Sequence, residues 1–197
     1  MSQMRRLAAI FAGLGLAALL VVGLIQAGGS GGAASPERPF DLARAKRQLA
    51  GAPAPLAGLH EQSAQLLHGG RSAFRKRLAA LKGYPVVVNK WASWCTPCRT
   101  EFPIFQHQAT LKGKRVAFLG VNAGDSLDPA KRFLRGMPVP FPSYLDPDED
   151  IAKWMRAPAN YPITVFFDAR GRPVYIHQGG YRRESDLAAD MRRYVGT

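Results

Sequence analysis

VNKWASWCTPCRTEFP, residues 88–103, contains the only two cysteines of the 197-residue chain, Cys95 and Cys98. Residues 85–91 form a short β-branched run typical of a buried strand, and residues 98–111 are predicted to form a helix. A sulfur at a helix start lies near unpaired backbone N–H groups and the positive end of the helix dipole, which favour the thiolate that attacks disulfides. The spacing therefore predicts a thiol-disulfide exchange centre. Cys95 is expected to be its exposed nucleophile of low pKa, and Cys98 the thiol that resolves the mixed disulfide.

Two other interpretations of the cysteine pair are weaker. An inert disulfide across so short a loop would constrain the unfolded chain little. A zinc site would need further ligands, and the four histidines lack the His-x3-5-His spacing of such sites: His60, His68, His107 and His177. We expect neither a metal nor a cofactor. Trp94 is expected to shield one side of the pair, and Pro97 has the fixed φ that suits a first helical turn.

Downstream of the cysteines, predicted strands and helices alternate. The strands lie at residues 116–122, 161–167 and 173–177, and the helices at residues 129–135 and 184–195. A four-residue turn, 168–171, joins the last two strands. An extra stretch, residues 137–160, contains a further helix near residues 150–155. This order predicts an α/β fold with helices on both faces of one sheet.

The N-terminal segment is predicted to anchor the chain in a membrane. Residues 7–25 carry no charge, and a bilayer core is spanned by roughly 20 apolar residues. Two arginines precede this segment within residues 1–6, and the next charge is Glu37, so the positive-inside rule leaves the N-terminus in the cytoplasm. A cleaved signal peptide ending near Ala27 is the alternative. Either way, the cysteines are expected outside the cytoplasm, at the cell membrane.

Three further parts complete the predicted organisation. Residues 26–36 have the Gly, Ser and Ala composition of a flexible linker. Residues 37–83 are predicted to form a mostly helical extension, and residues 84–197 the main domain. Within the extension we expect an amphipathic stretch (40–49), a Pro/Ala-rich break (50–55) and two helices (59–67 and 72–81).

The net charge of +13 makes nucleic acid a ligand class to consider. Lys and Arg are scattered over every segment after Pro36, and no basic run carries interleaved aromatic residues. No helix-turn-helix or zinc-finger spacing occurs. We therefore expect no nucleic-acid binding, and the charge is better suited to acidic lipid headgroups near the anchor.

Residues 88–103 resemble the active-site signature of the TlpA/ResA-type thioredoxin-like proteins. The resemblance covers residues 84–197 and continues through Gly120-Val121-Asn122, Phe141-Pro142 with Leu145-Asp146, and residues 161–168 with Gly171. It implies a thioredoxin-like fold with a central mixed sheet, helices on both faces, and an inserted strand and helix. It also implies a protein disulfide reductase. Its substrates would be exported proteins such as apocytochrome c, and a membrane electron donor would re-reduce it.

The resemblance also implies roles for residues around the cysteine pair. Pro162 matches the family's cis-proline, which faces the sulfurs and offers backbone to an incoming peptide; an ordinary edge-strand proline is the alternative. Glu101 matches a family acid near the pair, and it lies one helical turn after Cys98, where it could move a proton. A solvated glutamate favoured by the helix dipole is the alternative. The implied substrate contacts are Trp94, Pro97, Tyr161 and Pro162.

Three features depart from the family pattern. Family members usually have a β-hairpin before the first core strand, where this chain is predicted to be mostly helical. Lys90 stands where an aromatic residue is common. Asn89 stands where thioredoxin carries a buried acid, so that Glu101 is the obvious substitute.

Other functions compete with disulfide reduction. Oxidative folding of secreted proteins is the same exchange run in reverse. A non-catalytic binding module of this fold would have lost its sulfurs, and both are present. A peroxidase would need a Thr-x-x-Cys site, whereas Ala92 stands three residues before Cys95.

Overall fold

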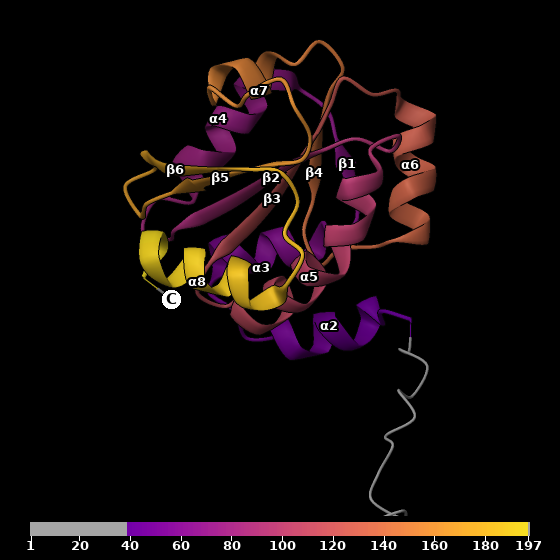
Figure 1. The fold of residues 1–197 in the computed structure, drawn as a ribbon. Helices are drawn as coiled ribbons and strands as arrows, with labels where there is room; N and C mark the ends of the chain where they lie inside the picture. Colours follow the sequence, from indigo (N-terminus) through magenta and orange to yellow (C-terminus); the bar gives the residue numbers. More distant parts are fainter. Residues whose placement is uncertain (1–38, 197) are drawn as a thin grey trace, which may run out of the picture. The chain divides into compact units, whose positions relative to one another are not determined.

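The computed structural model describes residues 39–196, so the predicted anchor and linker lie outside the described residues (Figure 1). The helices are α2 (Leu42–Leu49), α3 (Ala54–Glu61), α4 (Gly70–Ala80), α5 (Thr96–Lys112), α6 (Leu127–Gly136), α7 (Asp150–Trp154) and α8 (Glu184–Val195). The strands are β1 (Leu66–Leu67), β2 (Val86–Trp91), β3 (Ala117–Ala123), β4 (Ser143–Asp146), β5 (Ile163–Phe167) and β6 (Pro173–Gln178). Among these helices, none is both long and apolar enough to cross a membrane.

The strands form one mixed sheet in the order β1-β4-β3-β2-β5-β6 (Figure 1). The first four strands in this order, β1, β4, β3 and β2, run parallel to one another. β5 pairs antiparallel with both β2 and β6. Every residue of β2 and β3 is buried, because helices cover both faces of the central strands. A strand buried on both faces reads as a nearly continuous apolar run, which is why residues 85–91 predict one. The predicted α/β fold with a mixed sheet is confirmed.

Successive side chains of β2 point to opposite faces of the sheet. Val87 and Trp91 belong to the core that includes residues of α5, α6 and α8, whereas Val86 and Val88 belong to the core that includes residues of α3, α4 and α7. By the same alternation, Asn89 faces the layer of α5, and Lys90 faces the opposite layer. The two polar residues of β2 therefore lie on opposite faces of the sheet.

The support of α5 depends on a glycine in β3. The indole N–H of Trp91 donates a hydrogen bond to Ser143 Oγ over 3.1 Å, and a Cβ at Gly120 would lie 2.1 Å from that oxygen. The ring of Trp91 packs against Phe102 of α5 and Phe133 of α6, with centroids 5.3 Å and 4.9 Å away. Any side chain at position 120 would therefore disturb the aromatic cluster on which the cysteine-bearing helix rests.

The predicted helix at residues 59–67 is wrong. The structure has α3 at Ala54–Glu61, and Leu66–Leu67 form β1, which pairs with β4. Pro53 and Pro55 lie at the start of α3, where a missing N–H breaks no helical hydrogen bond, so the Pro/Ala-rich stretch opens the helix. Ala64, with a φ of 56°, then turns the chain toward the sheet.

The other predicted elements occur with small shifts. The amphipathic stretch at 40–49 forms α2, the helix predicted at 72–81 is α4, and the extra stretch at 137–160 contains β4 and α7. The helix expected from Cys98 begins earlier, at Thr96, because Cys95 serves as its N-cap. Pro97 lies in the first turn of that helix, as predicted.

Candidate active site

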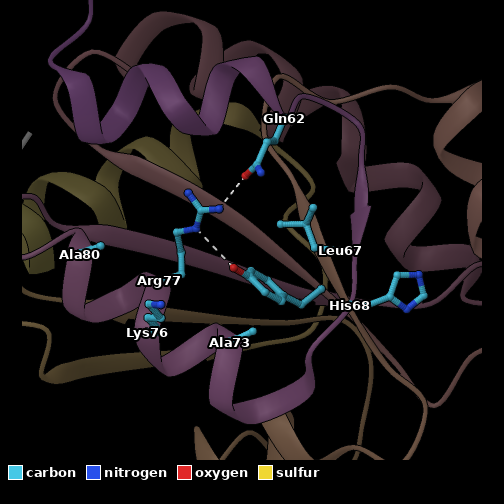
Figure 2. A pocket seen from close by; sticks show the side chains of 8 residues that line it. Gln62, Leu67, His68, Ala73, Lys76, Arg77 and Ala80 are labelled. Carbon is cyan, nitrogen blue, oxygen red and sulfur yellow. Dashed lines mark hydrogen bonds between the residues drawn. The ribbon is translucent and has the colours of Figure 1, made fainter.

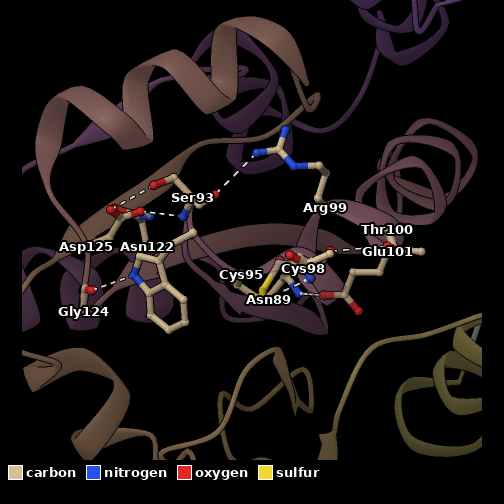
Figure 3. The surroundings of a disulfide bond; sticks show 12 residues. Asn89, Ser93, Cys95, Cys98, Arg99, Thr100, Glu101, Asn122, Gly124 and Asp125 are labelled. Atoms are coloured by element: carbon tan, nitrogen blue, oxygen red, sulfur yellow. Dashed lines mark hydrogen bonds between the residues drawn. A yellow bond between two sulfur atoms is a disulfide. The ribbon is translucent and has the colours of Figure 1, made fainter.

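Cys95 and Cys98 form a disulfide at the N-terminus of α5, with an S–S distance of 2.02 Å (Figure 3). Cys95 has extended backbone dihedrals as the N-cap residue, and its sulfur accepts a hydrogen bond from the backbone N–H of Cys98 over 3.1 Å. When the pair is reduced, this donor and the helix dipole would stabilise a thiolate at Cys95. The position predicted for the first sulfur is confirmed.

The prediction of an exposed Cys95 is wrong. Cys95 is 4% exposed and Cys98 is 0% exposed, and both belong to the core that contains Trp91 and Phe102. The preceding residue, Trp94, is 59% exposed, so the surface beside the sulfurs is aromatic. Of the two sulfurs, the one at position 95 still has the better access to a partner.

Asp125, in the loop after β3, holds the segment that leads to the sulfurs. Its carboxylate accepts hydrogen bonds from the backbone N–H and the hydroxyl of Ser93, at 2.6 Å and 3.0 Å, and from the Asn122 amide at 2.9 Å. Burial alone would raise the pKa of Asp125, but these bonds and one from the Ser126 N–H together lower it. The carboxylate therefore stays ionised and fixes the position of Ser93, two residues before Cys95.

Trp94 is held by Gly124, the residue before Asp125 in the same loop. Its indole N–H donates to the carbonyl of Gly124 over 3.1 Å (Figure 3). Its ring and that of Tyr161 pack edge to face at a centroid distance of 4.8 Å. Gly124 has a φ of +56°, and a Cβ there would lie 2.9 Å from the Tyr161 hydroxyl. Glycine at 124 thus lets the Trp94 and Tyr161 rings pack together beside Cys95.

The peptide bond between Tyr161 and Pro162 is cis, as the family resemblance implies. Pro162 directly precedes β5, and the first residue of β5 pairs with Lys90, near the end of β2 that leads to the cysteines. A Cβ at Gly180 would lie 3.4 Å from the Pro97 carbonyl oxygen, 3.6 Å from Pro162 Cγ and 3.8 Å from Glu101 Oε2. One glycine therefore lies where Pro97, Pro162 and Glu101 come together. The sequence alone does not show that these residues are close in space.

Glu101 is fully buried, so it is not the solvated first-turn glutamate considered as the alternative. Its Oε1 accepts a hydrogen bond from the Asn89 amide over 2.7 Å (Figure 3). Its Oε2 accepts one from the Tyr181 backbone N–H over 3.1 Å. Burial raises the pKa of Glu101 to about 7, against the opposing effect of the two hydrogen bonds. A carboxyl with this pKa can both accept and release a proton near neutral pH.

Asp125 and Tyr181 were missed by sequence reasoning. A signal for Asp125 was present, because Asn122 lies near the carboxyl end of β3 and Asp125 directly follows it, and β3 runs parallel to β2, the strand that leads to the cysteines. Polar residues at the carboxyl ends of neighbouring parallel strands gather at one sheet edge. Tyr181 had no such signal, since only its backbone N–H contacts Glu101, 80 residues earlier in the chain.

A separate pocket, with a volume of about 430 Å³, lies where α4 meets β1 and β4 (Figure 2). Within it, the Arg77 guanidinium donates to Gln62 Oε1 over 2.6 Å and to the Tyr144 hydroxyl over 3.3 Å. None of its lining residues belongs to the sulfur site. In residues 39–196, no group of three or more His, Cys, Asp or Glu side chains is arranged to hold a metal ion.

Known proteins share the sequence pattern and the fold of this chain. Residues 62–176, more than half of the chain, match the AhpC/TSA family. The chain belongs to this family. Its resemblance to the TlpA/ResA-type thioredoxin-like proteins is also confirmed, because its relatives include several proteins named as thiol-disulfide oxidoreductases or interchange proteins.

Two relatives and one solved structure illustrate the similarity. Thiol-disulfide oxidoreductase ResA of Bacillus subtilis (strain 168) is 32% identical over 106 residues, which cover 53% of this chain and 59% of ResA. Thiol:disulfide interchange protein DsbE of Xylella fastidiosa (strain Temecula1 / ATCC 700964) is 31% identical over 152 residues, covering 75% of this chain and 70% of that protein. A crystal structure described as thiol:disulfide interchange protein DsbE from Chlorobium tepidum has a TM-score of 0.52 at 28% identity, and covers 58% of this chain and 82% of that one. The match thus spans less than two thirds of ResA but more of the other two proteins.

Proposed function

We propose that this chain is a thiol-disulfide oxidoreductase that reduces disulfides in exported proteins. The observation that carries the proposal is the Cys95–Cys98 disulfide at the start of α5, with the buried Glu101 carboxyl in its surroundings. The names of its relatives support the same chemistry. Apocytochrome c, the best-known target of the TlpA/ResA-type proteins, is the proposed substrate.

The first half of the reaction uses the reduced pair. The Cys95 thiolate attacks one sulfur of the substrate disulfide, so that a Cys95–substrate bond forms and the substrate S–S bond breaks. The first substrate sulfur leaves as a thiolate and takes a proton from water. The Cys98 N–H at the helix start stabilises the attacking Cys95 thiolate.

The second half releases the product. The Glu101 carboxylate takes the proton of the Cys98 thiol, and the resulting thiolate attacks the Cys95 sulfur. The Cys95–Cys98 disulfide forms, the mixed disulfide breaks, and the second substrate sulfur leaves as a thiolate that takes the proton held by Glu101. Two electrons have then moved from the cysteine pair to the substrate. The two protons follow, one through Glu101 and one through water, because Cys95 releases its proton to water when it ionises. An external dithiol must return them before the next cycle.

The proposed substrate contacts surround the sulfurs. Trp94 offers an exposed ring, packed on Tyr161, to the side chains of an incoming polypeptide. Pro162 and the segment after Tyr161 offer backbone for pairing with that polypeptide. Pro97 lies between the cysteines and near Pro162, across Gly180, so a substrate at Cys95 would touch both prolines.

The proposed direction of electron flow predicts a low midpoint potential. Histidine in the place of Pro97 would stabilise the thiolate and thus the reduced form, which raises the potential. We therefore expect a value below roughly −200 mV, nearer thioredoxin at about −270 mV than the strongest oxidant of this fold at about −120 mV. Equilibration with glutathione buffers measures it, and Pro97→His should raise it. A wild-type value near the oxidant's would instead favour oxidative folding.

The proposed location is the outer side of the cell membrane, with residues 7–25 as the anchor and a membrane protein as electron donor. The protein should remain in membranes washed with carbonate, and a C-terminal reporter that works only in the cytoplasm should give no signal. A variant that lacks residues 7–25 is the control, and it should lose membrane attachment. Recovery of a shortened, released wild-type product would instead support a cleaved signal peptide.

A further inference from the structure

Lys90 is a fully buried lysine in the central strand β2. Its ammonium group donates a hydrogen bond to the Pro158 carbonyl over 2.8 Å, forms an ion pair with Glu149 at 3.1 Å, and lies 3.9 Å from the centroid of the Tyr161 ring. All three partners come from residues 149–161, between the N-cap of α7 and the residue before Pro162. The contacts therefore tie the loop that leads to Pro162 to the middle of the sheet.

A buried ammonium group is costly unless it is paired, so these contacts need an explanation. An apolar side chain would fill the same place on a strand whose face otherwise carries Val86 and Val88. Glu149 compensates the charge, and its side chain is 32% exposed. The Tyr161 ring is attracted to the cation through its electron-rich face, an interaction that strengthens out of water.

Lys90, Tyr161 and Trp94 form a column of stacked side chains that begins at Lys90 and ends beside Cys95. The Lys90 ammonium group packs on Tyr161, and Tyr161 in turn packs on Trp94, the exposed residue next to Cys95. The lysine itself faces the layer opposite α5, on the other side of the sheet from Asn89 and its Glu101 partner. Lys90 is thus placed to act on the surface that receives a polypeptide and not on proton transfer.

We propose that Lys90, with Glu149, is a positioning residue for polypeptide substrates. It holds the Tyr161 ring, and through it both Trp94 and the backbone at Pro162, in the arrangement that a peptide chain contacts. This inference rests on the proposed disulfide exchange. It deepens that function by separating recognition of a polypeptide from reaction at the sulfurs.

The experiment compares Lys90→Met with the wild type on two disulfides. Insulin tests recognition of a polypeptide, and hydroxyethyl disulfide tests the sulfurs alone. We expect the KM for insulin to rise roughly tenfold, while kcat for insulin and the rate with hydroxyethyl disulfide stay within about twofold. The midpoint potential of the cysteine pair should not change.

Lys153→Met is the matched control. Lys153 lies on α7 and donates to the Asp148 carbonyl over 2.7 Å, but it is exposed, so its loss removes the same charge without touching the column. If Lys90→Met does not fold, Glu149→Gln replaces it, and the KM for insulin should again rise while the small disulfide is unaffected. An equal loss with both disulfides, a shifted potential, or an unchanged KM for insulin would overturn the inference. A wild type that reduces neither disulfide would instead refute the proposed function.

Discussion

The Cys98→Ser variant is expected to accumulate mixed disulfides with its substrates, whereas Cys95→Ser should trap none. Cys95 attacks first because it is the less buried sulfur and accepts a hydrogen bond from the backbone N–H of Cys98 at the start of α5. Without Cys98 the covalent intermediate cannot be resolved. Turnover should fall by roughly a thousandfold or more in both variants, as when other enzymes lose a covalent nucleophile. Insulin reduction measures turnover, and non-reducing gels detect the trapped species.

The double variant Cys95→Ser with Cys98→Ser is the control for adventitious trapping through other sulfurs. Because the disulfide closes a loop of sequence separation 3, its removal should change the free energy of unfolding little, so all three variants should fold. Circular dichroism checks this. Trapping by Cys95→Ser alone would reverse the two roles.

The Glu101→Gln variant is expected to slow disulfide exchange by more than roughly tenfold at neutral pH, the low end of general acid-base effects. In the wild type the resolving step should accelerate as the pH rises through about 7, because the carboxylate form of Glu101 is the proton acceptor. Glutamine cannot accept the proton, so this rise should disappear. Rapid mixing with a preformed mixed disulfide, between about pH 5 and 9, measures the step.

Glutamine should fit the site of Glu101. Its carbonyl oxygen can accept from the Tyr181 N–H, and its amide can donate to Asn89 once that amide flips, because both ends of Asn89 can bond. Glu61→Gln, at an exposed position in α3, is the matched control. Equal rates for wild type and Glu101→Gln across this pH range would leave the carboxyl a purely structural role.

The same substitution has a second readout in protein stability. The pKa of Glu101 is raised in the folded state, from 4.5 to about 7, so its contribution to stability is full below about pH 4.5 and is lost as the pH rises through 7. The size of this loss is about 3 kcal/mol, since each pKa unit corresponds to 1.36 kcal/mol. Glu101→Gln should remove this pH dependence. Denaturant unfolding of the oxidised proteins at several pH values measures it.

Strand β2 and the start of helix α5 could be predicted from the sequence because the signals for both are local. A β-branched run forms β2 wherever a sheet can bury it, and the proline one residue before Cys98 has the fixed φ that suits the first turn of a helix. The pairing of β1 with β4 is not local. Leu66–Leu67 is extended because β4 offers backbone partners 77 residues later in the sequence, at Ser143 and Tyr144. Two residues are too few to show the periodicity of a strand.

The burial of polar side chains also could not be predicted from the sequence. In the sequence, Lys90 stands out only because an aromatic residue is common at its place in the family. Its burial depends on a carbonyl 68 residues later. The spacing of Glu101 from Cys98 predicts that it lies one turn further along α5. Its complete burial, and hence its raised pKa, depends on the chain around Tyr181, which folds back over it. Local patterns thus indicate which residues could react, and tertiary packing sets their protonation.

The two edges of the sheet are poor templates for another strand. β1 has only two residues, β6 begins with Pro173, which has no N–H to donate, and the pairing of β5 with β6 shifts register between Phe166 and Phe167. Long, regular edges invite association with foreign extended chains and aggregation. The proposed reduction of disulfides in exported proteins would bring extended chains of this kind close to the sheet. With both edges blunted, the proposed docking at Pro162 would meet little competition from the sheet, and an incoming chain would reach the sulfurs instead of pairing with an edge strand.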